Sequence, residues 1–266
     1  MQRISSPQNP VVKRLHSLER GRARREQGVY VAEGVRLIGE ALATEQDAEV
    51  VLYDPDALSR SGAGRALMAA LPGWVHSLYE ADARVLAAAA QTDTPAGIVA
   101  ALRYPTNAPL RSHRQDRLGI ILDRLADPGN AGTILRTAAA AGAGYVVTTP
   151  DTVDLFAPKV VRAGMGAHFL LPLYQSISWD QIGEDLVGVT AIVAEIEGDT
   201  SVFDLDWPAT AALIVGSEAH GLSEAAKSRA AEAVYVPMQP GVESLNASVV
   251  ASIIMYLALG PSMGGQ

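Results

Sequence analysis

Residues 118–136 read LGIILDRLADPGNAGTILR, and this stretch indicates the fold class of the second half of the chain. Its first part, Leu118–Asp123, is a continuous apolar run that ends in an acid, as expected for a buried parallel strand. The turn-forming residues 127–130 come next, with Asn130 as the predicted N-cap of a helix over about residues 131–141. A strand, a tight turn and a helix in this order predict an α/β fold, whose ligands bind at the carboxyl ends of the strands.

The same pattern continues along the rest of the chain. Apolar segments predict further strands at residues 144–148, 190–194, 211–216 and 233–236, and a final buried helix at about 246–259. Because helical segments separate these strands, the sheet is predicted to be parallel, with both faces covered.

The N-terminal part of the chain indicates a smaller α/β sandwich. An amphipathic basic helix is predicted over residues 10–26. Strands are predicted at residues 29–32, 50–53, 74–76 and 97–102, with an alanine-rich helix between the last two.

A change of composition separates the two parts. Residues 103–117 are polar and rich in proline and arginine, as expected for a linker. We therefore predict an α/β domain at residues 1–102, a linker at 103–117 and a larger domain at 118–266.

The distribution of charge matters more than the net charge of −8. Residues 1–36 contain eight cations and three acids, whereas after residue 170 only Lys227 and Arg229 oppose a dozen carboxylates. A basic segment on an acidic protein is suited to RNA phosphates, because each bound phosphate releases counterions. The alternative is a solvated, arginine-rich helix. The predicted RNA contacts are Lys13, Arg14, Arg22, Arg24, Arg25 and Arg36.

The composition also excludes several classes of protein. The chain has no cysteine, which rules out disulfides, thiol catalysis and cysteine-ligated metals. Its five histidines are scattered, so no metal site is predicted. The N-terminus lacks the pattern of a signal peptide, and no apolar run reaches the ~18 residues that span a bilayer. We expect a cytoplasmic protein with no membrane partner.

Three polar segments that follow predicted strands are candidates for a site. They read DPGNAGTILR at 127–136, GSEAHGLS at 216–223 and VPMQPGVESLN at 236–246. Ordinary turns and helix caps explain each one alone, but Arg136 lies on an otherwise apolar helix and needs an anion or solvent. NAD binding is a weak alternative, because the glycine pattern of a dinucleotide loop is missing.

In this order, D-P-G-N-x-G-T-x-x-R, G-S-E-x-x-G-L-S and V-P-M-x-x-x-x-x-S-L-N resemble the three motifs of the SpoU (TrmH) family. These proteins are RNA 2′-O-ribose methyltransferases of the SPOUT superfamily. The resemblance covers residues 118–260 and is specific for the family, though not for the RNA. NPVVK at 9–13 and VAEGVR at 31–36 also resemble the ribosomal-protein-like substrate-binding domain of many members, which makes residues 1–102 the expected RNA-binding domain.

The resemblance implies a parallel-sheet SPOUT domain with a C-terminal trefoil knot, a homodimer with a shared active site, and S-adenosylmethionine (SAM) as cofactor. By position, the implied SAM-binding residues are Gly216, Val236, Met238 and Leu245. Arg136 is implied to activate the ribose hydroxyl, and the implied supporting residues are Asn130, Glu218, Ser244 and Asn246. A guanidinium stays protonated at neutral pH and is therefore an awkward base. Arg136 therefore either acts with an RNA phosphate in proton removal or orients that phosphate and stabilises the alkoxide, and both roles stay open.

The implied function is methylation of a structured RNA, with ribosomal RNA favoured because of the separate N-terminal domain. A tRNA methyltransferase and a non-catalytic RNA-binding or ribosome assembly factor are the alternatives. Two departures from the family pattern concern the substrate more than catalysis. Ser217 stands where asparagine is frequent, and Met165 stands where a small polar residue is common.

Overall fold

The computed structural model describes residues 2–92 and 94–260, which form two compact units. One unit contains the described chain up to Thr106 together with Phe156–Phe169, and the other contains the rest. The boundaries predicted from the sequence assign residues 156–169 to the second domain. Those boundaries stay a prediction, and their ends at Met1 and 261–266 lie outside the described residues.

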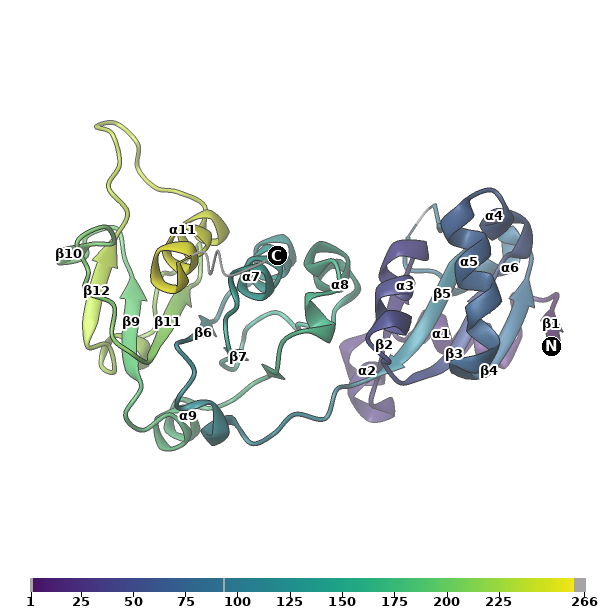
Figure 1. Ribbon diagram of the computed structural model, residues 1–266, viewed down its shortest axis with the longest axis horizontal. Helices are drawn as coiled ribbons and strands as arrows, with labels where there is room; N and C mark the ends of the chain where they lie inside the picture. Colours follow the sequence, from purple (N-terminus) through teal and green to yellow (C-terminus); the bar gives the residue numbers. More distant parts are fainter. Residues whose placement is uncertain (1, 93, 261–266) are drawn as a thin grey trace. The chain divides into compact units, whose positions relative to one another are not determined.

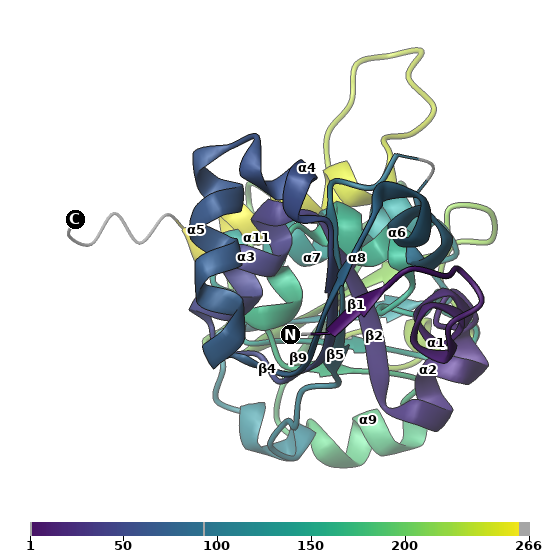
Figure 2. The ribbon, with the colours of Figure 1, turned by 90° about the vertical axis from the view of Figure 1, so that its right-hand side faces the viewer.

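The first unit is built on a five-stranded mixed sheet. In sheet order, the strands are β1 Gln2–Ile4, β4 Val75–Ala81, β3 Ala48–Tyr53, β5 Ile98–Arg103 and β2 Val29–Glu33. β1, β4 and β3 run parallel, and β5 runs antiparallel to both β3 and β2. The helices are α1 Pro10–Ser17, α2 Gly21–Gln27, α3 Val35–Ala43, α4 Pro55–Ser59, α5 Gly62–Ala70, α6 Ala83–Ala89 and α8 Pro158–Gly164. Figure 2 shows α3 and α5 on one side of this sheet and α1 and α6 on the other.

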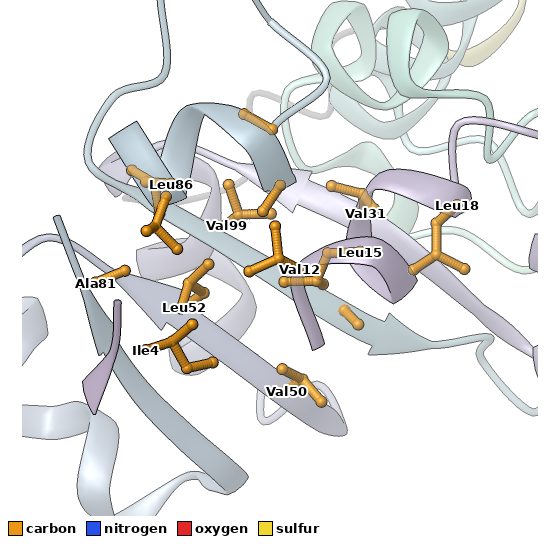
Figure 3. Close-up of a cluster of buried hydrophobic side chains, with 14 of the residues drawn as sticks. Ile4, Val12, Leu15, Leu18, Val31, Val50, Leu52, Ala81, Leu86 and Val99 are labelled. Atoms are coloured by element: carbon orange, nitrogen blue, oxygen red, sulfur yellow. The ribbon is translucent and has the colours of Figure 1, made fainter. Parts of the chain in front are cut away.

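One face of this sheet forms a hydrophobic core with α1 and α6 (Figure 3). Val31, Leu52 and Val99 from the strands pack with Leu15 of α1 and Leu86 of α6. Successive side chains of a strand point to opposite faces, and the intervening residues of these strands are buried as well. Burial on both faces explains why the strands are continuous apolar runs in the sequence.

The single helix predicted over residues 10–26 is wrong, because the chain forms α1 and α2 with a break between them. Nη1 of Arg24, in α2, donates to the carbonyl oxygens of Leu18 and Glu19, each at 2.7 Å. These two residues lie just beyond the end of α1, where a helix leaves carbonyl groups without intrahelical partners. The arginine side chain therefore stabilises the break.

The second unit is built on a seven-stranded sheet in which all neighbouring strands run parallel. In sheet order, the strands are β10 Thr200–Ser201, β12 Glu232–Tyr235, β9 Thr190–Ala194, β11 Ala211–Gly216, β6 Leu118–Asp123, β7 Tyr145–Thr148 and β8 Leu173–Tyr174. The predicted α/β class with a parallel sheet is confirmed. The sequence missed the short edge strands β8 and β10.

Four helices belong to the second unit as described: α7 Pro128–Ala141, α9 Trp179–Asp185, α10 Glu224–Lys227 and α11 Ala247–Leu259. α7 and α11 lie side by side (Figure 1), and the hydroxyls of Thr137 and Ser252 are 3.1 Å apart between them. On the opposite face, Ile182 of α9 packs with Ile121 and Val147 of the sheet. None of the described helices is long and apolar enough to cross a membrane.

The predicted start of α7 needs a correction. The helix begins at Pro128, and its N-cap is Asp127 in place of Asn130. Oδ1 of Asp127 accepts a hydrogen bond from the backbone N–H of Asn130 at 2.7 Å. This arrangement leaves the side chain of Asn130 available for other partners.

The contact between Gly119 and Tyr145 gives a test of the packing of this sheet. The two residues are opposite each other in β6 and β7, and a Cβ atom on Gly119 would lie 1.9 Å from Cζ of the buried Tyr145 ring. We expect Gly119→Ala to lower the free energy of unfolding by about 1–3 kcal/mol in urea denaturation, because overpacking strains a filled core. Gly39→Ala is the control. Gly39 lies in α3, and a Cβ there would meet no neighbouring atom within 4 Å. Gly39→Ala should therefore leave the free energy of unfolding unchanged or raise it by up to ~1 kcal/mol. Equal stability of the two variants would contradict the packing argument.

Candidate functional site

Three loops meet at one edge of the parallel sheet in the second unit. β6 and β11 are neighbours in register, with Gly216 opposite Asp123, so their carboxyl ends coincide. The loop after β6 leads into α7, and the loop after β11 contains Glu218. The segment after β12 runs through residues 236–246 to α11. These are the three segments that the sequence singled out.

Hydrogen bonds between side chains join the three loops. Nδ2 of Asn130 donates to Oε1 of Glu218 at 2.5 Å, and Oδ1 of Asn130 accepts from Nδ2 of Asn246 at 2.9 Å. Oδ1 of Asn246 accepts from the backbone N–H of Ser248 at 2.8 Å and so caps α11. Because backbone N–H groups only donate, the cap fixes which end of the Asn246 amide faces Asn130, and this in turn fixes the Asn130 amide. The network is therefore consistent in a single orientation.

The loops surround a cavity of about 780 Å³ at the carboxyl ends of β9, β11 and β12. This volume lies in the range of small-molecule sites, ~300–1,000 Å³. The predicted site residues that line it are Gly216, Glu218, Val236, Met238, Ser244, Leu245 and Asn246. All four predicted cofactor residues are therefore brought together, and Asn130 is hydrogen-bonded to the cavity wall.

Gly216 is required by the backbone of its own loop. Ser217 and Gly221 form an antiparallel bridge, with N–H···O distances of 3.0 and 2.8 Å. A Cβ on Gly216 would lie 2.7 Å from the carbonyl carbon of Gly221 and 2.9 Å from the nitrogen of Leu222. Close approach of the chain to itself thus explains this glycine.

The sequence did not single out Asp123, whose buried carboxylate forms hydrogen bonds that support the site. Its carboxylate is 1% exposed at the end of β6. Oδ2 accepts from the backbone N–H of Ser223 at 2.6 Å, and Oδ1 accepts from the hydroxyl of Thr149 at 3.2 Å and from Nε1 of Trp179 at 3.3 Å. These bonds satisfy a buried carboxylate and hold the end of the second loop. An acid that closes an apolar strand was the available signal.

Arg136 is not part of the cavity wall. It is exposed on α7 and makes no hydrogen bond or ion pair with any residue that the structure describes. Solvent therefore satisfies the guanidinium in this chain, which is one of the two outcomes that the sequence allowed.

The six predicted RNA contacts differ in their surroundings. Lys13 and Arg25 are exposed and unpaired within the described part of the chain. Arg22 and Arg36 are exposed, but each forms an ion pair with a glutamate one helical turn along the chain. The partners are Glu26 at 2.7 Å and Glu40 at 3.1 Å. Arg14 pairs with Glu49 at 2.6 Å.

Arg24 needs a correction as an RNA contact. It is 3% exposed, and its guanidinium is bonded to the carbonyls that follow α1. A side chain in this position supports the fold, and RNA cannot reach it without rearrangement. Among residues 2–92 and 94–260, no group of three or more histidine, aspartate or glutamate side chains is arranged to hold a metal ion.

A parallel α/β sheet with a cavity at the carboxyl ends of its strands defines a ligand-binding or catalytic α/β protein. Comparison with known families makes the class specific. Residues 117–256 match the SpoU rRNA methylase family, and residues 9–100 match the MRM3-like substrate binding domain. The chain therefore belongs to the SpoU rRNA methylase family.

Relatives match over almost the whole chain. An uncharacterised tRNA/rRNA methyltransferase of Synechocystis is 35% identical, over 96% of this chain and 92% of the relative. The 23S rRNA (guanosine(2553)-2′-O)-methyltransferase RlmP of Bacillus subtilis is 27% identical, over 96% and 98%. The crystal structure of an AdoMet-bound rRNA methyltransferase from Sinorhizobium meliloti aligns with a TM-score of 0.84 and 27% identity, over 97% of each chain.

The two roles of Asn246 can be separated by substitution. Asn246→Asp keeps an oxygen that caps α11 but replaces the donor that faces Asn130. If the Asn130 amide turns over, it loses its bond to Glu218, so one link is lost in either orientation. We expect a cost of about 1 kcal/mol in urea denaturation for Asn246→Asp. Asn246→Ala loses the cap as well and should cost about 2 kcal/mol. An unchanged midpoint for Asn246→Asp would show that the link to Asn130 contributes nothing.

Proposed function

We propose that this protein is a SAM-dependent methyltransferase that methylates a ribose 2′-hydroxyl of ribosomal RNA. The observation that carries the proposal is the bonding of Asn130 to both Glu218 and Asn246, which brings the three family motifs to one cavity. The 2′-O-methyltransferase from Bacillus subtilis and the AdoMet-bound relative support the reaction and the cofactor. We also propose that the protein works in the cytoplasm.

The cavity suits SAM in its chemistry. Val236, Leu245 and Val250 provide apolar walls for the adenine ring, and the carboxylate of Glu218 attracts the positively charged end of the molecule. Bound SAM supplies a methyl group that its sulfonium has already activated. The residues proposed to hold SAM are Gly216, Val236, Met238 and Leu245, through the loops on which they lie.

The remaining task of the protein is to place the ribose oxygen and handle its proton. Methyl transfer breaks a sulfur–carbon bond and forms an oxygen–carbon bond, while the hydroxyl proton leaves. Asn130 and Asn246 fix the loops that position the reactants. Arg136 binds the RNA phosphate beside the reacting ribose and stabilises the developing alkoxide, or acts with that phosphate in proton removal.

The proposal extends to the assembly. Val249 and Tyr256 on α11 are 46% and 49% exposed, and Arg136 is exposed on the neighbouring α7. We infer that two copies pair through these helices, which covers the apolar side chains and lets Arg136 take part in a shared site. We further infer that the C-terminal part of the chain forms a trefoil knot. This inference rests on the match of residues 117–256 to the SpoU rRNA methylase family.

Methyl transfer from labelled SAM to purified ribosomal RNA tests the function. We expect Arg136→Lys to keep SAM binding and dimerisation but to lose single-turnover methyl transfer by ~10²-fold or more, because lysine lacks the planar guanidinium fork. Arg60→Lys, on an exposed arginine outside the site, is the control and should keep the normal rate. Near-normal rates for Arg136→Lys would show that Arg136 is not catalytic. Transfer to tRNA alone would favour the tRNA alternative, and SAM binding without transfer to either RNA would favour the assembly factor.

The exposed cations of the first unit give a separate prediction. We expect the double variant Lys13→Gln/Arg25→Gln to bind RNA more weakly and to reduce the slope of log affinity against log salt by about 1.5, because two phosphate contacts are lost. SAM binding should stay unchanged. Arg14→Gln is the matched comparison, since Glu49 already pairs with that arginine, and it should change the slope by less. An unchanged slope in the double variant would remove these cations from the RNA surface.

A further inference from the structure

Three charged residues of the cavity wall belong to none of the three motifs: Glu195, Glu197 and Lys227. Two of them, Glu195 and Lys227, form an ion pair. Glu195 comes directly after β9, the strand between β11 and β12. Lys227 ends α10. Both line the cavity, and Nζ of Lys227 lies 3.6 Å from Oε1 of Glu195. The side chains are 47% and 33% exposed, respectively, so the pair is open to a ligand.

The backbone of Glu195 is fixed. Its N–H donates to the carbonyl oxygen of Val234 at 3.0 Å, which extends the pairing of β9 and β12 into the cavity wall. The Glu195 side chain is therefore attached to a rigid strand end, and the ion pair with Lys227 restricts the orientation of its carboxylate.

The carboxylates of Glu218 and Glu195 differ in how their charge is compensated. Glu218 is bonded to a neutral amide, so its negative charge is not compensated by that contact. Glu195 is paired with a cation. A compensated carboxylate beside a lysine suits neutral hydroxyl donors better than an ammonium group, which the lysine repels. An acid near the end of an adjacent strand also binds ribose hydroxyls in dinucleotide-binding α/β sheets.

We propose that Glu195 accepts hydrogen bonds from the ribose hydroxyls of the SAM nucleoside, and that Lys227 is a positioning residue for its carboxylate. This assignment rests on the proposed function. It directs the adenosine toward β9 and β12, and it leaves the sulfonium and amino-acid part near Glu218 and the Asn130 network. Glu195 would then determine the specificity for a ribonucleoside in this chain.

Binding calorimetry with two ligands tests the assignment without any activity measurement. S-adenosylhomocysteine contains both the ribose and the amino-acid part. Methylthioadenosine keeps the adenosine with its ribose but lacks the amino-acid part. We expect Glu195→Gln to weaken both ligands by about tenfold or more, because hydrogen bonds to a charged acceptor are lost. The 2′-deoxy form of methylthioadenosine should bind wild type more weakly by a similar factor but should be affected little by the substitution, since the same contact is already missing.

Control variants separate binding from a general effect of charge. Asp199→Asn removes an exposed acid of the same loop that does not line the cavity, and affinities should stay within about twofold. Lys227→Met should weaken both ligands by about threefold, and Lys227→Arg should restore them, as expected for a residue that acts through Glu195.

Each other result overturns a defined statement. If Glu195→Gln weakens S-adenosylhomocysteine but not methylthioadenosine, Glu195 contacts the amino-acid part and the assignment is wrong. If removal of the 2′-hydroxyl weakens methylthioadenosine binding as much in Glu195→Gln as in wild type, the ribose contact does not exist. If wild type binds neither ligand, the proposed SAM site fails together with the inference.

Discussion

The site depends on the two hydrogen bonds that the side-chain amide of Asn130 makes with the other two loops. The amide donates to Glu218 from the loop after β11 and accepts from Asn246 at the start of α11. An amide suits this position because it offers a donor and an acceptor on one planar group, whereas a carboxylate would repel Glu218. Asn246 uses its oxygen to cap α11 and its nitrogen to bind Asn130. The beginnings of α7 and α11 and the turn after β11 are therefore fixed by one chain of hydrogen bonds.

This chain of bonds is possible because the parallel sheet brings distant strand ends to one edge. β6 and β11 are in register with Gly216 opposite Asp123, although four strands of the same sheet, β7, β8, β9 and β10, come between them along the chain. The buried Asp123 then holds the backbone of Ser223, which follows the turn that folds back on Gly216. A parallel sheet with loops anchored from below thus provides a rigid edge, and a rigid edge is what a site with positioned ligands needs.

The elements of the fold were predictable where the signal is local. Apolar runs identified β2, β3, β5, β6, β9 and β11, because strands buried on both faces carry few polar residues. Prediction failed where a distant or competing contact decides. The break between α1 and α2 depends on Arg24, whose helical pattern gives no sign that it turns back to the carbonyls after α1. The cap of α7 is Asp127, because an acid and an asparagine three residues apart compete for the same role.

By itself, the sequence determined the α/β class, the positions of the main strands along the chain and the residues of three polar loops. Propensity, turn chemistry and apolar periodicity suffice for these features because they act over a few residues. Only the tertiary structure decided which polar groups meet. Asn130 finds Glu218 from 88 residues away and Asn246 from 116 residues away, because the strand order places their loops at one edge. It also decided that Arg24 is buried and that Arg136 is exposed. Burial depends on what packs across a helix, and the residues of the helix do not contain that information.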